Sequence, residues 1–249
     1  MSSHNVYNND FYSNQKNGSL LSAEVVVPII LEYFPDTKSV IDFGCGVGTW
    51  LSVFNKNGIE IIHGLDGEYV LKNELLIENN NFQPSDLKNE IKLENKYDIA
   101  LSLEVAEHIP EDRAETFVDN LVNSSNIIVF SAAIPGQGGD DHINEQWQSY
   151  WISKFEKRGF TLKGDLKDKI WNNDNVEFWY AQNINIFIKN TIIKNHSHLI
   201  NNSSSLRDIV HPKQLDLVLQ RPPEEDILYF TQTLKLLFKV FLKSIRNRV

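Results

Sequence analysis

The alternation of short β-branched segments with longer amphipathic ones constrains the fold of this chain more than any other feature. Apolar runs rich in Val, Ile and Leu stop at glycines or polar residues, which is typical of buried strands. Segments with apolar residues at helical spacing separate these runs. The pattern predicts an α/β fold, a mostly parallel sheet covered by helices on both faces. The expected strands are residues 39–43, 60–65, 97–103, 126–133, 160–166 and 184–188.

The same pattern divides the 249 residues into three parts. Residues 1–19 are rich in Asn and Ser, and we expect them to be loose and the first helix to start at Ser22. Residues 20–190 contain every expected strand and form one domain. Residues 191–249 contain a polar linker followed by a terminal helix, which Pro222 and Pro223 introduce.

The charge balance argues against nucleic acid as a partner. The chain has 24 Lys and Arg against 33 Asp and Glu, a net charge of −9, whereas phosphate binding needs a basic face. Its single cysteine, Cys45, fits a reducing compartment. No signal peptide is recognisable at the start, and the apolar run at 25–31 is too short to span a bilayer. We therefore expect a cytoplasmic protein.

Glycines and acidic residues follow the first two strands, where an open α/β sheet binds its ligands. Gly44, Gly46 and Gly48 follow the first strand and let the backbone approach a ligand closely. Asp42 lies inside the end of that strand, where it would repel a pyrophosphate but attract an ammonium group. Asp66 ends the second strand, at the place where a ribose diol is usually bound.

Two further motifs complete an ordered set. Residues 82–87 place Asp86 where it could accept a hydrogen bond from an adenine amino group, and residues 102–109, Ser-Leu-Glu-Val-Ala-Glu-His-Ile, begin at the end of the strand expected at 97–103. Together with residues 40–50 and Asp66, these motifs resemble the class I methyltransferases that use S-adenosylmethionine. The resemblance covers residues 20–190. It implies a Rossmann-like sheet of seven strands whose last strand, residues 183–189, is antiparallel, with helices on both faces.

The resemblance also implies a role for the residues nearest the methionine part of the cofactor. Gly44 and Gly46 would form the wall against it, and Asp42 would hold its amino group, directly or through water. Glu104 would lie beside the methionine portion and the sulfonium. An acidic pocket suits a cofactor that carries an ammonium and a sulfonium.

The resemblance implies that other residues of the same motifs bind the nucleoside part of the cofactor. Asp66 would take the ribose hydroxyls, and Asp86 with the backbone of Leu87 would take the adenine. Relatives often fold a lid over the cofactor from the segment before the first helix, which implicates Tyr12 and Ser22. Plain structural alternatives stay open, because Asp66 could cap the next helix and Asp86 could simply make a turn.

A glycine-rich loop at residues 136–147 follows the strand expected at 126–133 and would rise beside the methyl group. His142 is the candidate general base, because an unperturbed imidazole titrates near neutral pH. Glu145 is the candidate for binding acceptor hydroxyls, and His108 is a second catalytic candidate. Each has a structural alternative: His142 could cap a helix, Glu145 could complement a helix dipole, and His108 could make structural hydrogen bonds.

The same loop indicates no metal site. Asp140, Asp141 and His142 offer donors that hard cations accept, but adjacent residues seldom all point at one ion, and no second cluster at a ligand spacing is present. We therefore expect no metal.

The loop sequence also bears on the acceptor. Within the family it looks similar to a group associated with bacterial surface polysaccharide and sugar modification. That similarity implies O-methylation of a sugar or related polar metabolite. N-methylation, methylation of a phosphate-type oxygen, and a non-catalytic partner-binding subunit stay open as alternatives.

The carboxyl-terminal helix predicted at residues 226–249 has an apolar arc wider than one sheet face requires. Its narrow polar stripe consists of Thr231, Lys235, Lys239 and Lys243. Two interpretations stay open: the helix packs against the same or a second chain as a homo-oligomer contact, or it inserts shallowly at an anionic membrane surface. The second would make the cytoplasmic protein peripheral to the inner face of the membrane.

Overall fold

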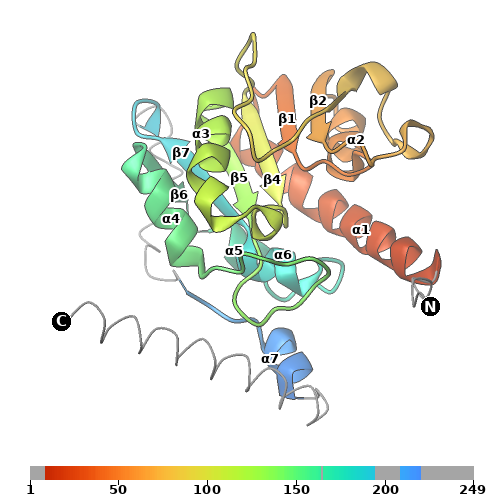
Figure 1. Cartoon of the computed structure of the whole chain (residues 1–249), viewed down its shortest axis with the longest axis vertical. Coiled ribbons are helices and arrows are strands. Elements are labelled where there is room, and N and C mark those ends of the chain that lie inside the picture. Colours follow the sequence, from red (N-terminus) through yellow and green to blue (C-terminus); the bar gives the residue numbers. More distant parts are fainter. Residues whose placement is uncertain (1–8, 164, 194–207, 220–249) are drawn as a thin grey trace, which may run out of the picture. The chain divides into compact units, whose positions relative to one another are not determined.

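The computed structural model describes residues 9–163, 165–193 and 208–219, with side chains from Gly18 onward (Figure 1). The chain forms two compact units, Met1–His211 and Pro212–Val249. The first unit contains the whole sheet. In the second, the described residues form one helix, α7 (Pro212–Leu219).

A mixed sheet of seven strands forms the centre of the first unit, in the order β3-β2-β1-β4-β5-β7-β6. The first five strands are parallel, whereas β7 runs antiparallel to both β5 and β6. This confirms the Rossmann-like sheet with its antiparallel last strand. The strands are β1 (Ser39–Phe43), β2 (Ile61–Asp66), β3 (Phe82–Pro84), β4 (Ile99–Leu103), β5 (Ile127–Ser131), β6 (Phe160–Lys163) and β7 (Asn185–Lys189).

Helices cover both faces of this sheet because successive residues of each strand point to opposite sides. In β1, Val40 packs into the cluster that contains α1, α2, α5 and α6, whereas Ile41 packs into the cluster that contains α3 and α4. Figure 1 shows α3 and α4 together on one side of the sheet and α1 and α2 on the other. The helices are α1 (Asn9–Tyr33), α2 (Thr49–Lys56), α3 (Ala114–Ser124), α4 (Gln148–Lys157), α5 (Leu166–Ile170) and α6 (Phe178–Asn183).

Helix α1 begins earlier than expected. Residues 9–19 are helical and not loose, and Ser22, the expected start, lies inside the helix. Ser22 is fully buried, donates a hydrogen bond to the carbonyl of Gly18 (2.7 Å) and accepts one from the backbone N–H of Glu177 (3.0 Å). These contacts hold Ser22 inside the helix despite the low helix propensity of serine.

Other boundaries also differ from expectation. The strand expected at 160–166 ends at Lys163, and Leu166 instead begins α5. Helix α7 falls where the sequence suggested only the end of a linker. The helix predicted at 226–249 lies outside the described residues. Within the described part of the chain, no helix combines the length and apolar character that crossing a bilayer requires.

Candidate active site

A cavity of about 710 Å³ opens at the carboxyl ends of β1 and β4. Ligands of open α/β sheets bind at this edge. The loops after β1 and β2 form one wall, and residues of α1 and α6 form the other. Its lining residues are Ser19, Asp42, Gly44, Cys45, Gly46, Val47, Thr49, Trp50, Tyr69, Val70, Leu71, Glu74, Leu103, Glu104, Trp179 and Tyr180.

The loop after β1 brings its backbone to the cavity wall. Gly44 has a φ of +89°, and a side chain there would come within 2.3 Å of Val105. The backbone N–H of Gly46 donates to Asp66 Oδ2 (2.7 Å), which joins the loop to the end of β2. Both expected wall glycines line the cavity together with Asp42.

Asp42 is a buried carboxyl group at the floor of this cavity. It is only 3% exposed, and burial raises its pKa to about 7, with a further contribution from the nearby Asp66. A carboxyl group in this position holds a proton until a cation replaces the missing solvation. The site is therefore suited to a positively charged ligand.

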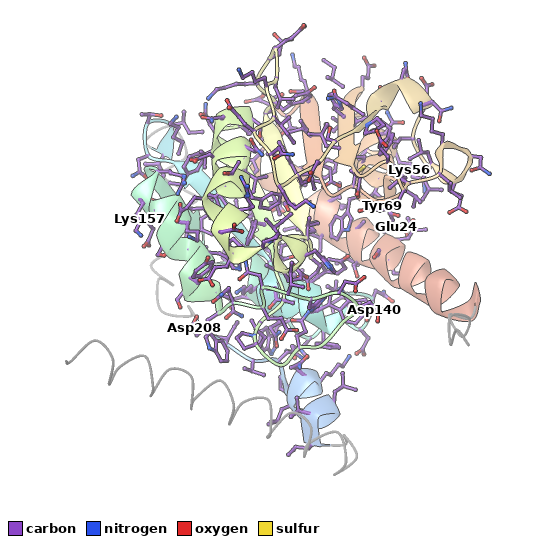
Figure 2. The ribbon with its side chains drawn as sticks, viewed as in Figure 1. Glu24, Lys56, Tyr69, Asp140, Lys157 and Asp208 are labelled. Atoms are coloured by element: carbon purple, nitrogen blue, oxygen red, sulfur yellow. The ribbon has the colours of Figure 1, made fainter. Side chains whose placement is uncertain are left out.

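Asp66 is also buried, and its carboxylate already has partners. It accepts hydrogen bonds from the backbone N–H groups of Gly46 and Gly67 (2.7 Å each) and from the hydroxyl of Tyr69. Tyr69, labelled in Figure 2, lies in the loop after β2 and is largely exposed. A ligand hydroxyl that binds Asp66 would have to displace this exposed tyrosine.

Glu104 lies at the end of β4 in a strained and well-fixed position. Its φ is +55°, in the left-handed region that non-glycine residues rarely adopt. Gln137 Nε2 donates to Glu104 Oε2 (2.8 Å), and Asn183 Nδ2 donates to Glu104 Oε1 (3.2 Å). Burial raises the pKa of the Glu104 carboxyl, and these hydrogen bonds offset the shift only in part. Strain of this kind is concentrated at functional sites.

Gln137 and Asn183 are site residues that the sequence did not single out. Gln137 stands in the glycine-rich loop, and Asn183 stands at the expected start of the last strand. Asn183 Nδ2 also donates to Gln137 Oε1 (2.8 Å), so the two amides and Glu104 form one network. The sequence could suggest neither, because only the fold brings the ends of β4, β5 and α6 together.

The β5–α4 loop (residues 132–147) places His142 beside Glu145. His142 Nδ1 lies 3.0 Å from Glu145 Oε1, and Glu145 also accepts backbone N–H hydrogen bonds from Gly136 (2.8 Å) and Gly138 (2.9 Å). Burial tends to raise the pKa of Glu145, but the hydrogen bonds from His142 and the two glycines outweigh it, and the pKa is lowered. Glu145 is therefore ionised and orients the imidazole.

His108 lies across from His142 on the 3-10 turn η3 (Ala106–His108). The two rings stand edge to face with their centroids 4.9 Å apart. Burial, followed by the charge of His142, lowers the pKa of His108. Asp140, also on the β5–α4 loop, is exposed (Figure 2). The structure thus brings His108, His142 and Glu145 together but not Asp140.

The remaining expected cofactor residues, like Asp66, lie outside the cavity lining. Asp86 is exposed and accepts hydrogen bonds from the backbone of Lys88 and the side chain of Asn89. Leu87 is buried in the core, and Ser22 joins α1 to Glu177. The side chain of Tyr12 lies outside the described residues. Roles for these residues in cofactor binding stay predictions.

Comparison with known proteins agrees with this geometry. A family model described as a methyltransferase domain matches residues 20–162, more than half of the chain. No curated protein matches the sequence.

Solved structures resemble the fold at low identity. Magnesium protoporphyrin IX methyltransferase from Synechocystis PCC 6803, with bound S-adenosylmethionine, has a TM-score of 0.50 at 19% identity, covering 70% of this chain and 83% of its own. A sugar N-methyltransferase from Streptoalloteichus has a TM-score of 0.54 at 13% identity, covering 76% and 98%. An amino pentose methyltransferase from Micromonospora echinaspora has a TM-score of 0.54 at 13% identity, covering 76% and 100%.

Since the family model spans most of the sheet and the strand-end cavity has the acidic character that this cofactor requires, the chain belongs to the methyltransferase-domain family, as an enzyme that uses S-adenosylmethionine.

Proposed function

We propose that this methyltransferase transfers the methyl group to a hydroxyl of a sugar or related polar metabolite, with His142 as the general base. The hydrogen bond between His142 and Glu145 is the observation that carries this proposal. It fixes an imidazole on the loop that follows β5, near Glu104 at the cavity wall. A methyl transfer that needs no base would not require a carboxylate held by two backbone N–H groups to orient a histidine.

Three acidic residues at or near the cavity are assigned to parts of the cofactor. In this proposal Asp42 holds the ammonium of S-adenosylmethionine, Asp66 takes the ribose hydroxyls after Tyr69 withdraws, and Glu104 faces the sulfonium side. The buried carboxyl groups of Asp42 and Glu104 supply negative charge where the cofactor carries positive charge.

The reaction balances with these groups alone. The acceptor oxygen attacks the methyl carbon in line with the carbon–sulfur bond, which breaks and leaves its electron pair on sulfur. The hydroxyl proton passes to Nε2 of His142. The imidazolium that forms is stabilised by Glu145, which accepts the hydrogen bond from Nδ1.

A sugar acceptor is supported by the aromatic and polar character of the cavity edge. Trp179 lines the cavity, and Trp147 on the β5–α4 loop, outside the cavity lining, is 42% exposed. Ring faces of this kind stack on the apolar face of a sugar. Two of the similar folds belong to enzymes that methylate sugars. In line with the loop's similarity to its group, we propose a cytoplasmic role in surface polysaccharide synthesis.

The test is a methyl-transfer assay with labelled S-adenosylmethionine and a panel of nucleotide sugars that offer hydroxyl or amino acceptors. His142→Ala should lower kcat by about 10²–10⁴-fold while leaving cofactor affinity, measured by calorimetry, unchanged. His63→Gln is the matched control, because His63 bonds to Tyr97 far from the loop. Transfer to amino sugars alone would replace the proposal with N-methylation, and normal turnover of His142→Ala would exclude His142 as the base.

A further inference from the structure

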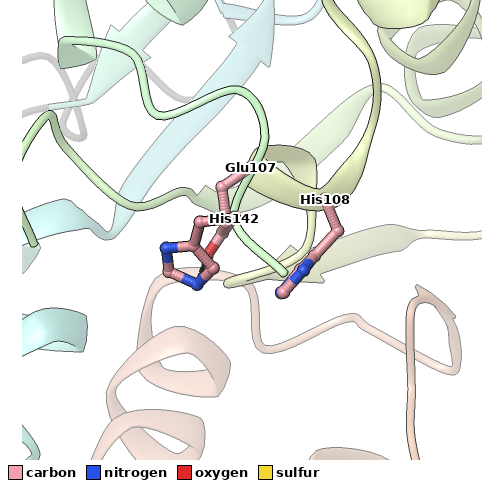
Figure 3. A group of neighbouring side chains, drawn as sticks. All are labelled: Glu107, His108 and His142. Carbon is pink, nitrogen blue, oxygen red and sulfur yellow. Dashed lines mark ion pairs between the residues drawn. The ribbon is translucent and has the colours of Figure 1, made fainter. Parts of the chain in front are cut away.

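Three side chains beside the proposed active site converge on one point. Glu107 and His108 come from η3 after β4, and His142 comes from the β5–α4 loop (Figure 3). Each offers one atom that can bind a metal, and these atoms all lie within 4.8 Å of one another. The two segments are well separated along the chain and meet only in the fold.

The Glu107 carboxylate lacks the partners that a buried carboxylate requires. The residue is 0% exposed, and within the described part of the chain neither of its oxygens makes a hydrogen bond of good geometry, although the backbone N–H groups of Glu107 and Ala133 lie nearby. The nearest polar side-chain atom across from it is Nε2 of His142, which lies 3.9 Å from Glu107 Oε1. Burying a carboxylate without hydrogen bonds is costly unless a cation compensates it. Because two imidazoles lie beside this carboxylate, a metal ion is a cation that could compensate it.

Both histidines can present Nε2 to this point. The Nδ1–H of His142 donates to Glu145 (3.0 Å), and the Nδ1–H of His108 donates to the carbonyl of Asp141 (3.3 Å). With the proton on Nδ1, the lone pair of each ring is on Nε2. Histidines that bind metals are held in this way, with the second nitrogen bonded to a carboxylate or a backbone carbonyl.

The backbone of the loop is fixed around the cluster. The N–H groups of Ile143 and Asn144 donate to the carbonyl of Glu107 (3.0 and 2.9 Å). Asp141, whose carbonyl holds His108, has a φ of +55°. A side chain at Gly139 would come within 2.3 Å of the His142 ring, so the loop requires glycine where the ring lies against it. Backbone strain in the loop therefore accompanies the positioning of these two rings.

We propose that Glu107, His108 and His142 bind a divalent first-row transition-metal ion. Two imidazoles with one carboxylate favour zinc, manganese, iron or cobalt over calcium or magnesium, which prefer oxygen ligands throughout. Ligand atoms bind such an ion at about 2.0–2.2 Å. The three atoms must therefore draw together around it, and rotation of the exposed His108 side chain supplies that movement.

Three protein ligands leave coordination positions open for substrate oxygens. Glu104, which lines the cavity, precedes Glu107 by three residues, and in this proposal the open positions face the reacting end of the site. Resting on the hydroxyl acceptor proposed above, this site binds that hydroxyl and lowers its pKa, so that its proton leaves to solvent water before attack. With the ion bound, Nε2 of His142 is a ligand and cannot accept the hydroxyl proton, so the general-base step described above applies only to the metal-free enzyme.

The first experiment measures ion binding without any acceptor. Full-length protein, stripped with a chelator, is titrated with Co²⁺ and Mn²⁺ and followed by absorption spectroscopy, electron paramagnetic resonance and calorimetry. We expect one ion per chain and a higher melting temperature with the ion bound. Glu107→Gln and His108→Ala should weaken binding by at least tenfold, whereas His63→Gln should bind as the wild type does.

The Glu107→Gln variant distinguishes loss of the proposed metal site from misfolding of the protein. The substitution keeps the shape of the side chain, so the variant should bind S-adenosylmethionine normally, yet its melting temperature should no longer respond to the ion. Wild-type protein that binds no ion at millimolar concentration, or Glu107→Gln that binds it equally well, would overturn the site. Ion binding without hydroxyl methylation would leave the site intact and reject the proposed function. Hydroxyl methylation that is unaffected by a chelator would restore His142 as the base.

Discussion

The buried carboxyl group of Asp42 affects both the stability of the ligand-free protein and the binding of a cationic ligand. Its pKa of about 7 in the folded, ligand-free protein is above its ordinary value of 3.8 because burial disfavours the charged form. The folded state therefore binds more protons than the unfolded state between about pH 4 and pH 7. Over that window the free energy of unfolding must fall as pH rises, since the carboxyl group is progressively forced to ionise without solvent.

We therefore predict that Asp42→Asn stabilises the ligand-free enzyme at about pH 8, by up to roughly 4 kcal/mol from the size of the shift. The same variant should bind S-adenosylmethionine more weakly, because an amide cannot neutralise the ammonium group. Urea denaturation at several pH values and calorimetry measure the two effects. If the variant is less stable than the wild type at high pH, the carboxyl group is not desolvated as described.

The hydrogen bond from Tyr69 to Asp66 should affect cofactor affinity. The Tyr69 hydroxyl donates to Asp66 Oδ1, an acceptor for which a ribose hydroxyl would compete. Tyr69→Phe should therefore strengthen S-adenosylmethionine binding by up to about 1 kcal/mol, the typical net value of one hydrogen bond. Asp66→Ala should weaken it by about 1–3 kcal/mol. Calorimetry on the two variants decides the point, since weaker binding in Tyr69→Phe would mean that the hydroxyl itself contacts the cofactor.

The sequence identified residues whose chemistry is local, and it missed those whose role depends on distant partners. Asp42, Gly44, Gly46 and Glu104 lie at or directly after strand ends, so their place at the cavity could be predicted from position alone. Glu107 was noted only as part of the motif after the fourth strand. Its burial without partners depends on the distant β5–α4 loop, which no local pattern reveals.

At the scale of elements, the site depends on how α1 and α6 meet. Ser22 on α1 accepts a hydrogen bond from the N–H of Glu177, the residue before α6. On the same two helices, the Ser19 hydroxyl lies 3.1 Å from the hydroxyl of Tyr180, and both residues line the cavity. One turn of α1 therefore offers two serines, one that supports the wall and one that belongs to it.

Ser22→Ala should consequently reduce stability and leave binding unchanged. Losing two buried hydrogen bonds should lower the free energy of unfolding by about 1–2 kcal/mol. Ser153→Ala is the matched control, because its hydroxyl bonds only within α4, to the carbonyl of Tyr150, and it should cost less. Thermal denaturation and calorimetry measure the effects. A large loss of cofactor affinity in Ser22→Ala would give Ser22 the direct role that its sequence position suggested.

Strand boundaries could be predicted where both faces of a strand are buried, because such a strand is a continuous run of apolar residues. Strands β1 and β5 fall inside their expected ranges because central parallel strands are continuously apolar. Strand β3 is three residues long and lies at the sheet edge, so it carries too little pattern to be recognised. Helix α1 begins earlier than the sequence indicated because residues with low intrinsic helix propensity, such as Asn and Ser, give no helical signal that a local pattern could detect.

At the scale of the whole molecule, one strand determines which side chains meet Glu104 at the end of β4. Strand β7 enters antiparallel between β5 and β6, so the chain returns to the carboxyl end of β5 just before it, through α6. Asn183 ends α6 there and reaches Glu104. The antiparallel direction of β7, which the family resemblance implied, therefore brings Asn183 to Glu104 at the end of β4.

The carboxyl-terminal segment gives a prediction for the whole molecule. Every residue that lines the cavity lies between Ser19 and Tyr180, in the first compact unit, whereas residues 225–249 belong to the second. Deleting residues 225–249 should therefore leave S-adenosylmethionine affinity within twofold of the full chain by calorimetry. Loss of binding in a truncated protein that still folds would show that the tail completes the catalytic unit.

The same deletion separates the two interpretations of the tail's apolar arc and lysine stripe. If the helix lies on an anionic membrane, flotation with phosphatidylserine vesicles should recover the full chain but not the truncated one, and salt should weaken recovery because the lysines contribute through charge. If it packs against a second chain, light scattering should show a dimer that the deletion converts to a monomer, without any dependence on lipid. A full chain that is monomeric and stays with the soluble fraction would exclude both contacts and favour packing of the helix on its own chain.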